Sequence, residues 1–175
     1  KLKEKLEEVL MELKEREFMA ALFYVDLDNF KHINDTLGHG YGDLLLKEIA
    51  KVFQELMKPG CTVFRVGGDE FIVLCENVLN HQQIRELADC LLEELRKEWK
   101  INEIETFVSV SVGITVIPED GVDYHDILKN ADAAMYVAKE EGKGRYKFFH
   151  EDMLRKVKVR SEMENSIRKA IEKNE

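Results

Sequence analysis

The sequence predicts a single α+β domain built around a mixed β-sheet. Segments rich in β-branched and aromatic residues are interleaved with amphipathic helical segments, and two adjacent apolar segments are joined only by the short turn GGDE. This turn indicates an antiparallel hairpin, which argues against a purely parallel βαβ sheet. The 175 residues suffice for one domain with one hydrophobic core, and no internal repeat or low-complexity linker interrupts them.

The composition excludes several classes of function. With 26 Lys and Arg against 35 Asp and Glu, the net charge is −9, which argues against a nucleic-acid or membrane-surface binder because such proteins need a basic surface. The cysteines show neither metal-ligand spacing nor the density of a secreted disulfide scaffold, so we expect reduced thiols and a cytoplasmic location. No signal peptide or membrane-spanning apolar run is visible in the sequence.

The first part of the chain predicts a helix, a buried strand and a second helix. Residues 1–18 carry leucines at helical spacing among charges, which indicates an amphipathic helix. The apolar run 20–25 predicts a central strand that is buried on both faces and ends at Asp26. The polar, glycine-containing segment 28–43 is typical of a long loop, and a helix is expected over 41–57.

The rest of the chain predicts the hairpin, further helices and two further strands. Asn80 is expected to cap a helix that runs to about Trp99. Valines and serines alternate in TFVSVSVGITVI, which predicts a strand with one small polar face. The elements expected in order are hairpin strands at 61–66 and 71–75, a helix at 80–99, a strand at 106–117, a helix at 123–141, a strand at 145–149 and a helix at 151–175.

Two pairs of acids lie where strands are expected to end. Asp26 and Asp28 follow the first strand, and Asp69 and Glu70 lie at the tip of the hairpin. If these strands are neighbours, the carboxylates converge and raise one another's pKa values, a cost that a hard divalent cation relieves. The sequence therefore predicts a magnesium site, and a plain turn with solvated carboxylates is the alternative.

The turn glycines and the polar segment after the first strand indicate a nucleotide. Gly67 and Gly68 would let a bulky anion approach the backbone N–H groups. Lys31, Asn34, His39 and Asp43 lie within reach of the acidic strand end. A carboxylate such as Asp43 accepts from the N1–H and N2–H groups of guanine, whereas adenine presents an acceptor at N1. The simpler alternatives are a helix cap for Asp43, a turn for Asn34 and an exposed loop position for His39.

A third group of candidate residues closes the penultimate helix. The segment AKEEGKGR supplies Lys139, Lys143 and Arg145, with Gly142 as a candidate helix C-cap. These cations either complement the helix dipole or bind phosphate.

Four motifs, in this order, resemble those of the GGDEF domain, the diguanylate cyclase family: DLDNFKHINDTLGHGYGD, RVGGDEF, VSVSVGIT and ADAAMYVAKEEGKGR. The resemblance runs from about residue 18 to 149. It implies a palm-like nucleotidyl cyclase fold, with a mixed, mostly antiparallel five-stranded sheet flanked by helices and the GGDEF β-hairpin at the active site. It also implies a GGDEF domain over 1–150, including the N-terminal helix 1–18. The C-terminal helix 151–175 resembles a linker to a following EAL domain, and a generic amphipathic helix is the alternative.

The resemblance implies an activity as well. Members of the family condense two GTP molecules into cyclic di-GMP and two pyrophosphates, with Mg²⁺ or Mn²⁺, across a transient antiparallel homodimer of half-sites. Asp26, the backbone carbonyl of Leu27 and Asp69 would hold the metal, and Asp69 and Glu70 are the implied catalytic residues. The alternative is a catalytically silent GTP-binding domain that controls a neighbouring EAL phosphodiesterase domain. A sensor domain upstream and an EAL domain downstream are implied in a longer, cytoplasmic or membrane-anchored protein.

The substrate contacts implied by the resemblance follow from motif position. Asn34, His39 and Asp43 would bind the guanine nucleoside. The phosphates would contact Lys31, Lys139, Lys143, Gly67 and Gly68. Lys143 replaces the arginine of many relatives, which keeps the charge but loses the planar fork. The RxxD motif of product-inhibited relatives reads KPGC here at 58–61, so we expect no tight cyclic di-GMP binding at that position.

Overall fold

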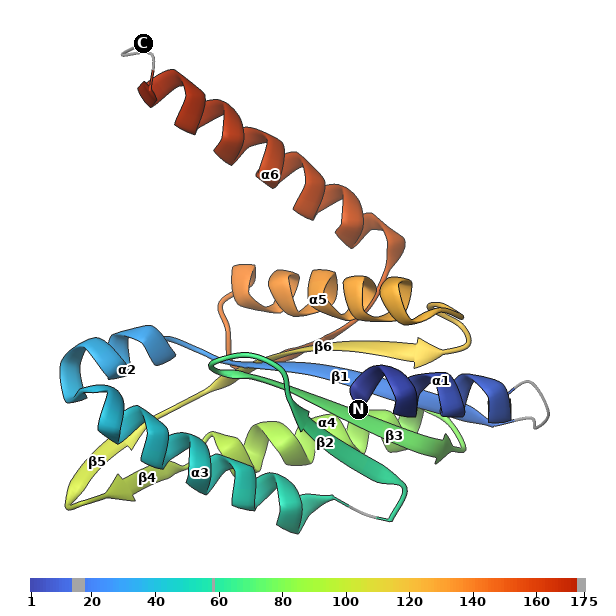
Figure 1. Ribbon diagram of the computed structural model, residues 1–175, viewed down its shortest axis with the longest axis horizontal. Helices are drawn as coiled ribbons and strands as arrows, with labels where there is room; N and C mark the ends of the chain where they lie inside the picture. Colours follow the sequence, from blue (N-terminus) through green and yellow to red (C-terminus); the bar gives the residue numbers. More distant parts are fainter. Residues whose placement is uncertain (14–17, 58, 173–175) are drawn as a thin grey trace.

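A computed structural model of the chain describes residues 1–13, 18–57 and 59–172, the last of these ranges partly by its backbone alone (Figure 1). The elements are α1 (Leu2–Leu13), β1 (Met19–Leu27), α2 (Phe30–Leu37), α3 (His39–Leu56), β2 (Cys61–Arg65), β3 (Glu70–Val78), α4 (His81–Leu95), β4 (Glu98–Ile101), β5 (Ile104–Phe107), β6 (Val110–Ile117), α5 (Tyr124–Glu140), β7 (Tyr146–Phe148) and α6 (Glu151–Glu172). The N-terminal helix predicted over 1–18 is thus observed over Leu2–Leu13, and 14–17 lie outside the described residues.

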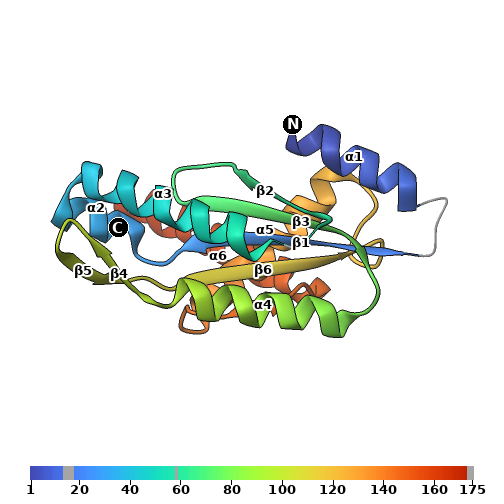
Figure 2. The same ribbon diagram turned by 90° about the horizontal axis from the view of Figure 1, so that it is seen from below.

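The main sheet has the strand order β2-β3-β1-β6-β7 (Figure 2). Its strands pair antiparallel except for β6 and β7, which are parallel. The predicted α+β fold with a mixed, mostly antiparallel five-stranded sheet is therefore confirmed. The central strand β1 is a continuous apolar run because both of its faces are covered.

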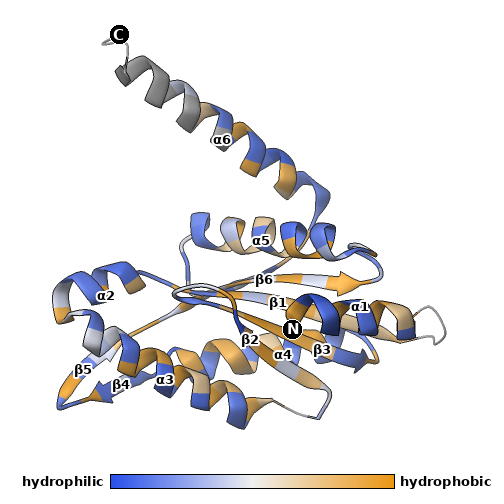
Figure 3. Ribbon diagram, viewed as in Figure 1, coloured by the Kyte–Doolittle hydropathy of each residue, from blue (hydrophilic) through white to orange (hydrophobic). Residues whose placement is uncertain are grey.

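Two hydrophobic layers enclose the sheet. Ala20 and Leu22 of β1 face α1 and α5, where they pack with Leu6. The alternate residues of β1 face the opposite layer of α2, α3 and α4, where Phe23 packs with Phe53. Figure 3 shows hydrophobic colouring on the strands and on parts of the helices that cover them, whereas the coloured part of α6 is mostly hydrophilic and projects away from the sheet.

A glycine in β6 sets the distance between α5 and the sheet. A Cβ atom on Gly113 would lie 1.9 Å from the carbonyl oxygen of Ala131 and 2.3 Å from the backbone nitrogen of Met135. Any larger residue would therefore push α5 outward. This close approach brings the C-terminal end of α5 to the strand ends that carry the candidate site (Figure 1).

The segment predicted as a long loop is mostly helical, so that prediction is wrong. Phe30 and Ile33 are buried one helical turn apart and anchor α2, and α3 begins at His39. Gly38, with φ 85°, separates the two helices. Of the Asn, Asp and Gly residues that indicated a loop, Asp35, Gly40 and Asp43 are exposed on the helices, and Gly38 forms this break.

The helix predicted to reach Trp99 ends earlier. Asn80 caps α4 as predicted, because its side-chain oxygen accepts from the backbone N–H of Gln83, but the helix ends at Leu95. Trp99 lies instead in β4, which forms a separate two-stranded ribbon with β5. The strand predicted over 106–117 is observed as β6 from Val110, whereas Thr106 and Phe107 lie in β5. The helices predicted at 123–141 and 151–175 and the strand at 145–149 are confirmed as α5, α6 and β7, with 173–175 outside the described residues.

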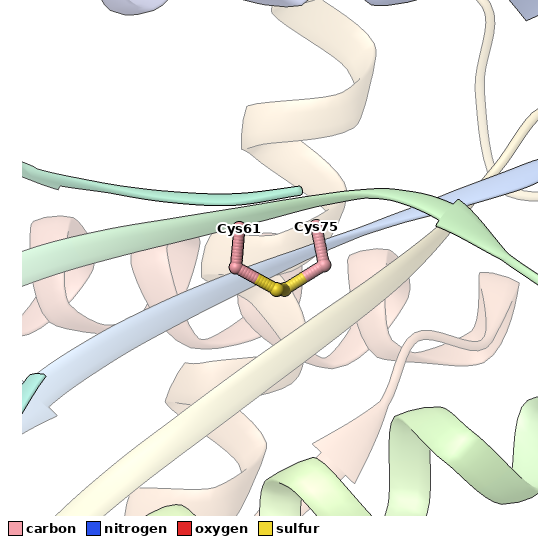
Figure 4. Close-up of a disulfide and its surroundings, with 2 residues drawn as sticks. All are labelled: Cys61 and Cys75. Carbon is pink, nitrogen blue, oxygen red and sulfur yellow. A yellow bond between two sulfur atoms is a disulfide. The ribbon is translucent and has the colours of Figure 1, made fainter. Parts of the chain in front are cut away.

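The expectation of reduced cysteines is also wrong, because Cys61 and Cys75 form a disulfide (Figure 4). The two residues are directly opposite in the β2–β3 ladder, with Cα atoms 4.1 Å apart. The neighbouring pair, Gly60 and Glu76, is joined by a backbone hydrogen bond of 2.8 Å, so the cysteines occupy a non-hydrogen-bonded position where side chains are closest. Cys90 is the free cysteine.

The N-terminal half of α6 is attached to the rest of the domain. The Arg160 guanidinium donates to the Glu140 carboxylate and lies 5.3 Å above the ring centroid of Tyr136. Both partners lie on α5, close to Lys139. Among the helices in the described ranges, none combines the length and apolar character that crossing a bilayer requires.

Candidate functional site

The predicted acids of β1 and of the hairpin lie at the same end of the sheet. The backbone N–H of Leu27 donates to the carbonyl of Asp69 at 3.3 Å, and the β1–β3 register places Asp26 opposite Glu70. Figure 1 shows the β2–β3 turn beside the end of β1 and below the C-terminal end of α5. The expected convergence of Asp26, Asp69 and Glu70 is therefore observed.

A lysine from α5 neutralises the central acid. Lys139 Nζ lies 2.7 Å from Asp26 Oδ2, and the Asp26 side chain is 10% exposed. Burial raises the pKa of Asp26 to about 6; Lys139 opposes this shift, and the carboxylates of Asp69 and Glu70 add to it. The described charges at this strand end are therefore more negative than positive. This makes an ionised carboxylate unfavourable and an added cation favourable.

Two residues of this cluster were missed in the sequence. Burial raises the pKa of the Tyr24 phenol, and the carboxylates of Glu70 and Asp132 raise it further. The signals were available, because Tyr24 lies two residues before Asp26 on one strand and Asp132 lies two helical turns before Lys139 on α5.

Asp28 does not join these acids, contrary to expectation. It is 3% exposed and accepts hydrogen bonds from the Ser109 and Ser111 hydroxyls, each at 2.6 Å, and from the backbone N–H of Gly144 at 3.0 Å. The small polar face predicted for the strand 106–117 is occupied in this way. Asp28 therefore connects the end of β1 to the loop between α5 and β7.

That loop carries Lys143. The ammonium of Lys143 donates to Asn29 Oδ1 at 2.7 Å, beside the acidic strand end. Gly142, Lys143 and Gly144 all have positive φ angles, of 115°, 62° and 57°. Three such residues in succession make a tight reversal, which aims the lysine back toward β1.

The residues predicted to bind guanine lie on α2 and α3. Asn34 packs against Gly42, since a Cβ atom on Gly42 would lie 1.9 Å from Asn34 Oδ1. This oxygen is buried and has no hydrogen-bond partner among the described residues. Asp43 and His39 are exposed on α3. Because α3 begins at His39, Asp43 is the fifth residue of the helix, and the alternative that it caps this helix is wrong.

The remaining predicted phosphate contacts lie around the turn. Gly68 is exposed, and its carbonyl accepts from the Arg65 guanidinium at 2.7 and 3.2 Å. A Cβ atom on Gly67 would lie 2.6 Å from Glu70 Oε2, so a side chain there would displace the Glu70 carboxylate. Lys31 is exposed in the first turn of α2, and no contact in the described part of the chain joins it to the acids.

The donor atoms suit a hard cation that keeps part of its hydration. No three His, Cys, Asp or Glu side chains of the described residues are grouped closely enough to hold a metal ion alone. Mg²⁺ is usually bound through one or two carboxylates, with water and substrate phosphates completing its octahedron. The carboxylates of Asp26 and Asp69, with backbone carbonyl oxygens at the same strand end, fit this pattern.

Known proteins are similar to this chain in sequence. Residues 1–145 match a sequence model of the family described as "Diguanylate cyclase, GGDEF domain". The chain is 38% identical over 156 residues to the Escherichia coli cyclic di-GMP phosphodiesterase PdeR, covering 89% of this chain and 23% of that protein. It is 34% identical over 174 residues to the Pseudomonas aeruginosa bifunctional diguanylate cyclase/cyclic di-GMP phosphodiesterase MucR, covering 99% and 25%. The chain thus spans about a quarter of the length of these relatives.

Solved structures agree with the sequence matches. The GGDEF domain of TpbB (YfiN) from Pseudomonas aeruginosa superposes with a TM-score of 0.86 at 28% identity, covering 90% of this chain and 92% of that one. The GGDEF domain of DgcB from Caulobacter crescentus, in complex with c-di-GMP, gives a TM-score of 0.75 at 25% identity, covering 83% and 86%. With the strand-end acids, the GGDE turn, Lys139 of α5 and Lys143 of the following loop arranged as described, this chain belongs to the GGDEF domain family.

Proposed function

We propose that this domain is a diguanylate cyclase, which condenses two GTP molecules into cyclic di-GMP and releases two pyrophosphates. The observation that carries this proposal is the cluster of Asp26 and Glu70 with Lys139, whose ammonium lies 2.7 Å from Asp26. An acid pair and a cation beside an open glycine turn can bind a metal-bound triphosphate. Phosphoryl transfer needs little else from a protein than such positioning and charge neutralisation.

The metal would be Mg²⁺, with Mn²⁺ as an alternative, held by Asp26, Asp69 and the Leu27 backbone carbonyl. Such an ion would neutralise charge on the phosphates and lower the pKa of the attacking hydroxyl. Without the ion, Lys139 neutralises Asp26. With a cation bound to Asp26, the Lys139 ammonium would be available to the triphosphate. Asp69 is proposed as the proton acceptor, with Glu70 beside it.

The nucleotide would lie between the GGDE turn and the α2–α3 pair. We propose that Asn34, His39 and Asp43 bind the guanine nucleoside, and the unpartnered buried Asn34 oxygen supports this. It can accept from a guanine N–H group, which would satisfy a polar atom that is costly to bury alone. Phosphate contacts are proposed for Lys31, Lys139, Lys143, Gly67 and Gly68.

Turnover would require two copies of the domain. One domain offers one set of metal and guanine residues, while the product joins two nucleotides. The attacking 3′-hydroxyl must therefore come from GTP held by a second copy, in a transient antiparallel homodimer. A proportional rise in activity per molecule with protein concentration is the expected kinetic sign of this dimer.

A second candidate is a GTP-binding domain without turnover that regulates a neighbouring EAL phosphodiesterase domain. The relative PdeR is named a phosphodiesterase, and this chain matches only 23% of its length. The part of PdeR outside the match can carry that activity, which favours a regulatory role for the matched part. For both candidate functions we propose that residues 1–150 form the GGDEF domain and that α6 links it to a following domain. A sensor domain would precede it, and the domain would bind GTP in the cytoplasm.

The test is incubation of the protein with GTP and Mg²⁺, followed by chromatography of the products. Cyclic di-GMP from the wild type and none from Asp69→Ala supports the cyclase. Asp89→Ala, an exposed acid on α4, is the matched control and should keep full activity. Calorimetric GTP binding without product at any protein concentration supports the regulatory domain, and no GTP binding refutes both.

A further inference from the structure

The loop between α5 and β7 is attached to β1 by a buried carboxylate that the proposed reaction does not use. Asp28 is 3% exposed, and its two oxygens accept from two hydroxyls and one backbone N–H. Ser111, one of the donors, is fully buried in β6. A buried carboxylate with several converging donors is held rigidly, because each donor would be costly to leave unpaired.

The contact to Gly144 fixes an unfavourable backbone conformation. Lys143 has a φ of 62°, which a residue with a side chain adopts only when its surroundings impose it. The N–H of the next residue, Gly144, donates to Asp28, and the Lys143 ammonium donates to Asn29. The Arg145 side chain folds back and donates to the Lys143 carbonyl at 3.2 Å. The loop is thus held in one shape from three directions.

We propose that Asp28 is a positioning residue for triphosphate binding. It holds the 142–145 loop so that Lys143 faces the phosphates, and it couples this lysine to the same strand end that carries Asp26. This inference rests on the proposed function, since it assigns Lys143 to the phosphates. Asp28 itself contacts neither metal nor nucleotide, because its oxygens are already occupied by the protein's own donors.

The hydrogen bonds around Asp28 predict how severely different substitutions of this residue affect the loop. Asp28→Ala leaves the Gly144 N–H without an acceptor and frees the loop. Asp28→Asn keeps one oxygen for Gly144 and Ser109, while the Ser111 hydroxyl can rotate to accept from the new amide. Asp28→Ala should therefore be severe and Asp28→Asn mild, although both remove the charge.

The experiment measures binding of inorganic tripolyphosphate with Mg²⁺, and separately of guanosine, by calorimetry. We expect Asp28→Ala to weaken tripolyphosphate binding at least tenfold, Asp28→Asn less than threefold, and neither to change guanosine binding. Amide hydrogen exchange at Gly144 should accelerate in Asp28→Ala. Ser109→Ala, which keeps the carboxylate and removes one donor, should show a smaller loss and provides the test if Asp28→Ala does not fold. Asp35→Ala, exposed on α2, is the matched control.

A double-mutant comparison isolates the role of Lys143. In a Lys143→Met background, Asp28→Ala should weaken tripolyphosphate binding less than twofold further, because the residue it positions is already gone. Unchanged tripolyphosphate binding in Asp28→Ala, an equal loss of guanosine binding, or additive effects with Lys143→Met would each overturn the inference. Wild-type protein that binds neither tripolyphosphate nor GTP would instead refute the proposed function, and the inference with it.

Discussion

Replacing Asp26 with asparagine should stabilise the protein in the absence of metal while it removes metal binding. Asp26 is ionised at neutral pH in a buried position beside two other carboxylates, and the Lys139 ammonium compensates only in part. The asparagine side chain would have nearly the same shape and no charge to bury. The Lys139 side chain is 31% exposed, so water can solvate its ammonium after the substitution.

The size of the effect follows from the pKa of Asp26. Its rise from 3.8 to about 6 corresponds to about 3 kcal/mol, at about 1.4 kcal/mol per unit. Above pH 6 the carboxyl is ionised in both folded and unfolded chains, so the folded protein bears the whole cost. Between pH 6 and 3.8 the folded chain takes up the proton first, and the cost fades as the pH falls. The free energy of unfolding of Asp26→Asn should therefore exceed that of the wild type by about 3 kcal/mol at pH 8 and by little near pH 4.

Urea unfolding with a chelator present, followed by circular dichroism at pH 8 and at pH 4, measures both differences. Mg²⁺ added together with GTP should raise the stability of the wild type and raise that of the variant less. Asp89→Asn on α4 serves as the control and should change stability by less than about 0.5 kcal/mol at either pH. The reasoning fails if Asp26→Asn is no more stable than the wild type at pH 8, or if its advantage is the same at both pH values.

Three further predictions concern base choice, packing and the disulfide. Asp43→Ser should reduce the preference for GTP over ATP at least tenfold in competitive binding, whereas Asp35→Ser should not; an unchanged preference would contradict the guanine assignment. Gly113→Ala should cost about 3 kcal/mol in urea unfolding because the new methyl group would overlap the α5 backbone, while Gly40→Ala, with open space around it, should cost nothing. Joint replacement of the Cys61–Cys75 pair by alanines should lower stability by about 3 kcal/mol for a loop of this length, and a reductant should then have no effect on the variant; equal stability with and without the disulfide would contradict it.

The sheet was predictable because its strands carry signals that do not depend on distant contacts. The buried run of β1, the GGDE turn and the alternation in β6 each specify a strand through local composition. The cap of α4 was equally readable, since Asn80 bonds to a backbone group only three residues away.

The errors arose where tertiary contacts decide. The helix α2 is short and rich in turn-forming residues, and it forms because Phe30 and Ile33 are buried against the core. The β4–β5 ribbon turns at Asn102 and Glu103, both with positive φ. The sequence has no glycine at these positions to indicate a turn. The disulfide was missed because counting outward from a four-residue GGDE turn pairs residue 61 with residue 76, whereas the observed register pairs it with residue 75.

In the candidate site, too, local sequence signals predict some residues and tertiary contacts decide the others. Asp26, Asp69 and Glu70 could be grouped from the sequence because neighbouring strands were expected to carry them. The contact of Lys139 with Asp26 spans more than a hundred residues and depends on the close packing of α5 at Gly113. The turn of Asp28 away from the acids depends on Ser109, Ser111 and Gly144, whose positions only the folded structure supplies.

The contact between Lys139 and Asp26 has a consequence for how ligands would bind. A metal ion alone would have to separate the ion pair and leave the ammonium without a partner, and a triphosphate alone would leave the carboxylate exposed to its acidic neighbours. When both ligands arrive, each charge of the pair gains a new partner. We therefore expect positive heterotropic coupling, in which each ligand tightens the binding of the other by the same factor. The resting protein would then discriminate against free magnesium and against free nucleotide, and respond to their complex.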